Sequence, residues 1–131
     1  MTQISPREVR RRFSGLPLAE RFHVWARLLS APLQPIVDAV PQGRFLDLGC
    51  GHGVLSAWVA VSRPDVRVVA IDPDARKTHW AAMALQGLSN VDVRTGDAAS
   101  LLPEFGNGFA NGFAKGFDGV VLADVLYLLP P

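Results

Sequence analysis

Three glycines at alternate positions, Gly49, Gly51 and Gly53, follow an apolar run that contains Asp47 near its end. Glycine is needed where the backbone turns with a positive φ angle, or where it lies against a ligand without a Cβ between them. The next apolar run ends at Asp72, 21 residues after Gly51. An acidic side chain about 20 residues beyond such a turn is placed to accept hydrogen bonds from ribose hydroxyls. The spacing therefore predicts a loop that binds a nucleoside.

The positions of Asp47 and Gly53 argue against a dinucleotide. In the dinucleotide pattern G-x-G-x-x-G, the third glycine lies inside the following helix and allows close packing. Here Gly53 comes one residue early, and Val54 takes the packing position. A carboxylate at Asp47 would repel a pyrophosphate, but it would attract a ligand that carries an ammonium or a sulfonium. A glycine turn without a ligand is the alternative, and Asp72 counts against it.

With its D-x-G-x-G-x-G pattern starting at Asp47, the chain resembles the class I S-adenosylmethionine-dependent methyltransferases over residues 43–129. The resemblance implies an enzyme that uses S-adenosylmethionine as its cofactor. A nicotinamide dehydrogenase on a similar fold is disfavoured by Asp47 and by Val54, which stands where a glycine would be. The implied cofactor-binding residues are Asp47, Gly49, Cys50, Gly51, Gly53, Asp72, Pro73, Asp97 and Ala98.

The resemblance also implies individual roles. Asp72 would bind the ribose, Pro73 would lie beside the adenine, and Asp97 would meet the adenine amino group. The candidate catalytic residues are Asp124 and Tyr127, because either could orient or deprotonate an acceptor hydroxyl or amine. Asp124 could equally cap an element or contact the cofactor.

Methyl transfer from a sulfonium is an in-line displacement, so the protein mainly aligns the two reactants and excludes water. No Ser-His-Asp or metal-ligand constellation is required, and the sequence shows none. Residues 123–127 lack the Asn/Asp-Pro-Pro-aromatic pattern of enzymes that methylate amino groups of bases and glutamine. We therefore expect a small-molecule or lipid-like acceptor. The alternative is a cofactor-binding half-domain with a structural or regulatory role and no catalytic activity.

From residue 43 onward, predicted strands alternate with predicted helices. The strands are expected at 45–49, 66–71, 91–95 and 117–123, and the helices at 53–62, 74–87 and 98–103. This alternation predicts an α/β, Rossmann-like, doubly wound parallel sheet with helices on both faces. Ligands bind such sheets outside the carboxyl ends of the strands. Asp47, Asp72, Asp97 and Asp124 are expected at or near those ends.

Residues 1–42 are predicted to form a helical extension of the cofactor-binding domain, residues 43–131. Within it, residues 5–40 are expected to form two helical pieces, broken by Pro17, Pro32 and Pro35. An apolar stripe recurs at helical spacing, at Leu18, Phe22, Trp25 and Leu29. We expect this stripe to pack on the domain. His23 has no recognisable partner.

The extension is also basic. Through Ser30 the chain carries six arginines and two glutamates, so this part has a net charge of +4 and the remainder −3. A basic arm can bind nucleic acid or anionic lipid. Such a run is more often a solvated helix face, and Phe13 is the one aromatic residue close to the arginine cluster. The sequence therefore disfavours a nucleic-acid partner.

Composition bounds the remaining possibilities. A chain of 131 residues with 49% hydrophobic and 19% charged residues suits one domain with a buried sheet and argues against disorder. No apolar run approaches the ~20 residues of a membrane span. The single cysteine, Cys50, cannot form an internal disulfide, so a reducing cytoplasm is the simplest location. A nucleophilic role for Cys50 is a minor alternative.

The last quarter of the chain has two unusual features. Residues 107–118 are near-copies of one four-residue unit that contains Gly-Phe, and they are predicted to form a loop. The sequence then ends just beyond the fourth expected strand, whereas the sheet of the family usually has seven strands. We expect either a fragment of a longer protein or self-association through the edge of the fourth strand.

Overall fold

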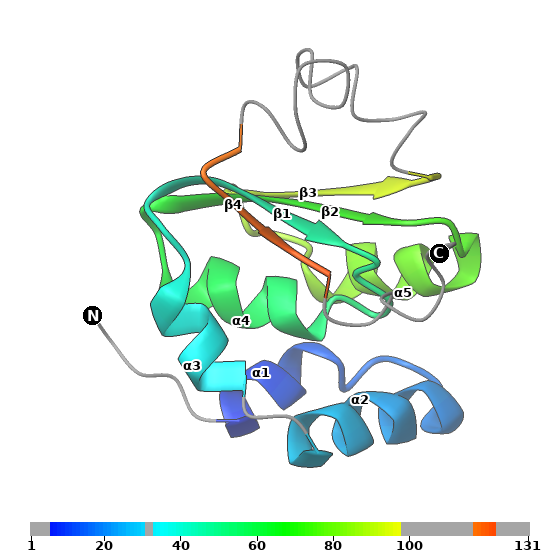
Figure 1. Cartoon of the computed structure of the whole chain (residues 1–131). Helices are drawn as coiled ribbons and strands as arrows, with labels where there is room; N and C mark the ends of the chain where they lie inside the picture. The colour runs from blue at the N-terminus through cyan, green and yellow to red at the C-terminus, as the bar shows by residue number, and fades with distance from the viewer. Residues whose placement is uncertain (1–5, 31–32, 98–116, 123–131) are drawn as a thin grey trace.

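The computed structural model describes residues 6–30, 33–97 and 117–122. In this part of the chain, four parallel strands form a sheet in the order β3-β2-β1-β4 (Figure 1). The strands are β1 (Gly43–Leu48), β2 (Val66–Asp72), β3 (Val91–Thr95) and β4 (Gly119–Val121). Because β1 pairs with both β2 and β4, the strand order reverses beside β1. The predicted Rossmann-like α/β fold is confirmed.

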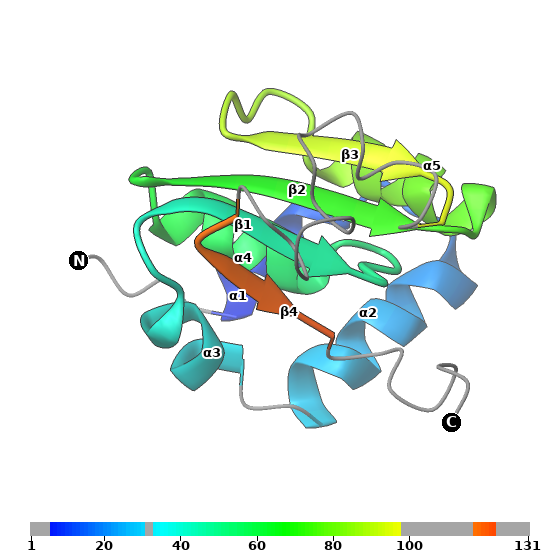
Figure 2. The same cartoon turned by 45° about the horizontal axis from the view of Figure 1, so that its top comes forward.

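The sequence predicted helices on both faces of the sheet, but the described helices all lie on one side of it, in two layers (Figures 1 and 2). The layer next to the sheet consists of α4 (Val54–Ser62) and α5 (Ala75–Ala84). Beyond it, α1 (Pro6–Arg12), α2 (Leu18–Ser30) and α3 (Leu33–Ala39) each contact α4. The helix expected at 98–103 lies outside the described residues. So do residues 107–116 of the four-residue repeat.

The apolar character of β1 and β2 explains their position in the sheet. Successive side chains of a strand point to opposite faces, and here both faces are apolar. Phe45 and Val68 join the core cluster beneath the helices, whereas Leu46, Val69 and Ile71 form a second buried cluster on the other face. Strands that are buried on both faces are typical of a parallel sheet.

The N-terminal extension differs in detail from the prediction, because it contains three helices rather than two pieces. Pro35 does not break a helix but lies in the first turn of α3, where the backbone N–H that proline lacks would have no intrahelical partner. The buried guanidinium of Arg63 fastens the end of α3 to the domain. It donates hydrogen bonds to the carbonyl oxygens of Val37 and Val40 at 3.1 and 2.7 Å.

The boundaries of the other elements lie within a few residues of the expected ones. β3 has the predicted range 91–95, whereas β4 is shorter than the predicted 117–123. Helix α5 ends at Ala84 rather than at residue 87. Gly87, with φ 90°, turns the chain in the left-handed region that commonly ends a helix.

The expectation that the apolar stripe of α2 packs on the domain is wrong. Its four residues are Leu18, Phe22, Trp25 and Leu29, with exposed fractions of 75%, 64%, 46% and 75%. The buried side of α2 carries Glu20 and Val24 instead, at 5% and 2% exposed. Helix α2 therefore buries the side that carries Glu20 and Val24, and its apolar stripe is exposed on the surface. No helix in the described ranges is long and apolar enough to cross a membrane.

Candidate cofactor-binding site

The glycine loop, residues 49–53, connects β1 to α4 at the carboxyl edge of the sheet. Its start is fixed to the neighbouring strand, because the backbone N–H groups of Gly49 and Cys50 both donate to the Ile71 carbonyl oxygen, at 2.7 and 3.0 Å. The Gly53 N–H then donates to the Cys50 carbonyl oxygen at 3.0 Å. These bonds hold a tight turn beside the point where the strand order reverses, which is where such sheets bind ligands.

Gly51 and Gly53 of this loop differ in the space around the position of a Cβ. At Gly51, with φ 57°, no atom beyond the adjacent residues of the chain lies within 4 Å of the position that a Cβ would occupy. At Gly53, with φ 83°, a Cβ would lie 3.1 Å from the Cβ of Ala81 in α5. Gly51 therefore leaves open space at the turn, whereas Gly53 permits close packing between the loop and α5. Val54 is buried too, but the close approach expected there occurs at Gly53.

Asp72 lies at the end of β2 and joins two segments of the site. One carboxylate oxygen accepts a hydrogen bond from the Gly51 N–H at 2.9 Å, and the other accepts from the Asp74 N–H at 2.8 Å. A carboxylate offers about four lone-pair positions. Two acceptor positions on the Asp72 carboxylate therefore remain beyond these two backbone bonds.

Asp74 continues this arrangement as the N-cap of α5. Its side chain accepts hydrogen bonds from the backbone N–H groups of Arg76 and Lys77, at 3.0 and 3.4 Å. The start of α5 is thereby fixed beside the glycine loop.

Asp47 lies on the helix-facing side of β1 and is 3% exposed. The Ser56 hydroxyl, on the first turns of α4, donates a hydrogen bond to the Asp47 carboxylate at 2.6 Å. Ser56 has no exposed surface, so this charge-assisted bond ties the strand before the loop to the helix after it. Ser56 could not be predicted from the sequence, since a lone serine in an apolar helix gives no signal without the position of its partner.

The other predicted site residues differ in exposure, and some of them lie outside the described residues. Pro73 and Asp97 are exposed, directly after β2 and shortly after β3. The turn before Asp97 lies against the site, because the Gly96 N–H donates to the Asp72 carbonyl oxygen at 3.0 Å. Cys50 is only 6% exposed, which disfavours the alternative of a nucleophilic thiol. Ala98, Asp124 and Tyr127 lie outside the described residues.

A cluster of polar side chains, the loop clamp, holds the outer side of the glycine loop. It consists of Glu20 and His23 from α2, His52 from the loop and Arg76 from α5. The Glu20 carboxylate bonds the Nε2 atom of His52 and lies 3.1 Å from the Arg76 guanidinium. His23 stacks on His52 with 6.0 Å between the ring centroids, so His23 does have a partner.

The loop clamp also perturbs the titration of its carboxylate. The hydrogen bond from His52 lowers the pKa of Glu20 below its ordinary value, and the charge of Arg76 acts in the same direction. Burial opposes the shift without cancelling it. Glu20 therefore serves as an ionised contact between the N-terminal extension and the loop.

The sequence matches a known family over most of this region. A family model described as "Methyltransferase small domain" covers residues 23–106. The chain belongs to this family. The predicted class, the S-adenosylmethionine-dependent methyltransferases, and the predicted cofactor are confirmed by this family match.

Two relatives are ribosomal RNA methyltransferases of bacteria. Ribosomal RNA small subunit methyltransferase C of Pseudomonas fluorescens is 40% identical over 74 residues, which cover 55% of this chain and 22% of that protein. Ribosomal RNA small subunit methyltransferase G of Sorangium cellulosum is 32% identical over 89 residues, which cover 64% of this chain and 37% of that protein. The chain thus spans well under half the length of these relatives.

A solved structure supports the fold over nearly the whole chain. The crystal structure of EvdMO1 has a TM-score of 0.58 and covers 97% of this chain and 30% of its own chain. Its sequence identity of 20% supports the similarity of fold alone.

The expectation that nucleic acid is not a partner is wrong, because these relatives act on ribosomal RNA by name. That expectation was based only on aromatic residues that are close to the arginines in sequence. Folding brings others near, since the Arg10 guanidinium lies 5.9 Å from the ring centroid of Trp25.

Proposed function

We propose that this chain is the S-adenosylmethionine-binding part of a methyltransferase that acts on RNA. The observation that carries the proposal is the glycine loop held by Asp72, whose geometry leaves room at Gly51 and free acceptor positions on the carboxylate. The kinship with ribosomal RNA methyltransferases supports RNA as the acceptor class. We further propose that residues 43–131 hold the cofactor, that residues 1–42 extend this domain, and that the protein works in the cytoplasm.

The residues of the site would divide the work as follows. Asp72 would accept hydrogen bonds from the ribose, Pro73 and Asp97 would lie beside the adenine, and the loop from Gly49 to Gly53 would pass close to the ligand. Asp47 would place negative potential beneath the loop while its bond to Ser56 keeps the loop and α4 in register. When bound, S-adenosylmethionine supplies a methyl group on a sulfonium with a neutral thioether as the leaving group.

Calorimetric titration tests the cofactor assignment. S-adenosylhomocysteine should bind the 131-residue chain, and NAD should not, because Asp47 and the spacing of the glycines disfavour a pyrophosphate. Tight binding of NAD together with no binding of S-adenosylhomocysteine would overturn the assignment.

A transfer assay tests the acceptor. With labelled S-adenosylmethionine, label should enter ribosomal RNA and not a panel of small hydroxyl and amine compounds. Label in the small compounds alone would return the acceptor to the class first expected from the sequence. Binding of the cofactor without transfer to either would favour the alternative of a non-catalytic cofactor-binding domain.

A further inference from the structure

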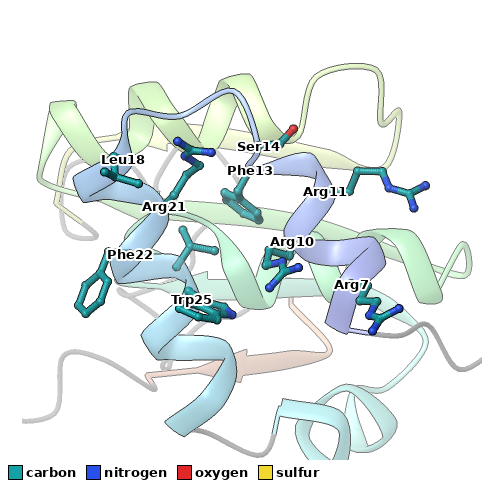
Figure 3. A pocket seen from close by; sticks show the side chains of 10 residues that line it. Arg7, Arg10, Arg11, Phe13, Ser14, Leu18, Arg21, Phe22 and Trp25 are labelled. Carbon is teal, nitrogen blue, oxygen red and sulfur yellow. The ribbon is translucent and has the colours of Figure 1, made fainter.

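A groove between α1 and α2 gathers exposed arginines and aromatic rings (Figure 3). We call it the α1–α2 groove, and its volume is about 670 Å³. The lining residues that matter here are Arg7, Arg10, Arg11, Arg21, Phe22 and Trp25. Figure 3 shows it on the side of α1 and α2 that faces away from the sheet, whereas the glycine loop lies at the carboxyl edge of the sheet.

The charge of the groove is entirely positive, since no acidic residue lines it. Glu20 belongs to the same helix as Arg21, but its carboxylate is directed to His52 and Arg76 in the loop clamp. Among the described residues, no carboxylate forms an ion pair with Arg7, Arg10, Arg11 or Arg21. Glu8 of α1 is not among the lining residues either. Four cations in one groove that no acidic residue lines attract a polyanion.

Not every arginine of this region is available for a ligand. Arg12 donates hydrogen bonds from Nη1 to the carbonyl oxygens of Ala84 and Gln86, at 3.2 and 3.3 Å. It therefore fastens α1 to the end of α5. The four arginines of the groove have no such role among the described contacts, apart from the cation–π contact of Arg10 with Trp25.

Two aromatic side chains of the groove are exposed, although large apolar side chains on a helix usually pack in the core. Phe22 is 64% exposed and Trp25 is 46% exposed. Large apolar side chains grouped on a surface mark an interaction site. Single-stranded RNA is bound by surfaces that combine cations for the phosphates with aromatic rings on which the bases stack.

We propose that the α1–α2 groove binds single-stranded RNA, with the four arginines on the phosphates and with Phe22 and Trp25 stacked on bases. The inference rests on the proposed function in taking RNA as the acceptor class. The position of α2 connects the groove to the methyl-transfer site, because Glu20, next to Arg21, bonds His52 of the glycine loop. RNA in the groove would thus be held at the end of α2 that is nearest the cofactor loop.

Fluorescence anisotropy with a labelled single-stranded RNA tests the charged contacts. The double variant Arg11→Gln/Arg21→Gln should bind at least tenfold more weakly in about 0.1 M salt. Its slope of log affinity against log salt should be shallower by about 1.4, since each phosphate contact to a single strand contributes about 0.7. The control Arg67→Gln/Arg94→Gln removes the same net charge from exposed positions on β2 and β3. It should change the affinity less than twofold.

A second pair of variants tests stacking. Trp25→Ala should weaken RNA binding by roughly 5- to 100-fold, whereas Trp25→Phe should keep most of the affinity because a ring is still present. Equal binding by Trp25→Ala and the unchanged protein would overturn the stacking assignment.

The outcomes separate this inference from the proposed function. If the unchanged protein methylates RNA and the groove variants bind and methylate it equally well, the groove inference is wrong and the proposed function stands. If the unchanged protein binds S-adenosylhomocysteine but no RNA, the groove inference and the RNA acceptor of the proposed function both fail, while the cofactor assignment stands. If the groove variants lose binding to anionic vesicles, or lose a dimer in light scattering, with RNA affinity intact, the groove serves a membrane or a second copy and the inference is overturned.

Discussion

At the scale of single residues, the site depends on carboxylates that are already engaged in the protein. Asp72 holds Gly51 and Asp74, and Asp47 holds Ser56. Each carboxylate therefore has a structural role in addition to any contact with the cofactor. For variants at these positions, both the stability of the fold and the affinity for the cofactor must therefore be measured.

Replacing Asp72 by alanine should weaken the binding of S-adenosylhomocysteine by roughly 1–3 kcal/mol, since the ribose hydroxyls lose a charged acceptor. The Gly51 N–H also loses its acceptor, so the melting temperature should fall. Calorimetry and thermal unfolding together measure the two effects. Asp38→Asn, at an exposed position in α3, is the control. Unchanged affinity in a folded Asp72→Ala variant would remove the ribose assignment.

Replacing Ser56 by alanine should lower the free energy of unfolding by roughly 1–3 kcal/mol, because a buried carboxylate at Asp47 loses its hydrogen-bond donor. Ser14→Ala, at an exposed position, should change it by less than about 0.5 kcal/mol. Urea unfolding measures both variants. Equal stabilities would show that the bond between Ser56 and Asp47 does not stabilise the fold.

At the scale of elements, the glycine loop is held from two sides. Asp72 and the Ile71 carbonyl bind its backbone from the sheet, and the loop clamp binds its outer side from α2 and α5. Gly51 and Gly53 of this loop are not equivalent, because Gly51 faces open space and Gly53 faces helix α5.

Gly51→Ala and Gly53→Ala should separate binding from stability. Both place a side chain on a backbone with positive φ, which costs about 1–2 kcal/mol. Gly53→Ala should cost more, because its Cβ would also press on Ala81 at 3.1 Å. Gly51→Ala should mainly reduce affinity for S-adenosylhomocysteine, since its Cβ enters open space. The opposite ranking of stabilities in urea unfolding would contradict the packing role of Gly53.

The loop clamp should make stability depend on acid pH. Because the folded-state pKa of Glu20 is lowered, its contribution is fully present above its ordinary pKa of 4.5 and is lost as the pH falls through the lower folded-state value. Urea unfolding between about pH 6 and pH 3 should show a smaller loss for Glu20→Gln than for the unchanged protein. Parallel curves for the two proteins would show that Glu20 does not contribute.

At the scale of the whole molecule, the N-terminal extension shares one core with the sheet domain. Val9 and Phe13 of the extension belong to the same buried cluster as Phe45 and Leu55. The outer face of the extension is left for other contacts, and the α1–α2 groove lies there.

Two phenylalanines of the extension test this division. Phe13→Ala should lower the free energy of unfolding by about 3–5 kcal/mol, because the side chain is 1% exposed within the core. Phe22→Ala should change it by less than about 0.5 kcal/mol, since Phe22 lies on the surface. Thermal unfolding compares the two. A small loss for Phe13→Ala would mean that the extension does not contribute to the common core.

The sequence alone determined the sheet and the cofactor loop of this protein. Residues 68–71 are apolar without a break, and the spacing of the glycines and Asp72 is that of a strand, a turn and a helix followed by a second strand. Local patterns of apolar residues and glycines therefore suffice to predict the strands and the loop themselves.

Only the tertiary structure decided how α2 is oriented and what surrounds the loop. The stripe from Leu18 to Leu29 has the spacing of a buried face, but the contact of Glu20 with His52, 32 residues away in sequence, turns it outward. The bond between Ser56 and Asp47 and the approach of Arg10 to Trp25 likewise depend on distances between elements. Such contacts leave no periodic signal, because their energy comes from pairs of residues that meet only after the chain has folded.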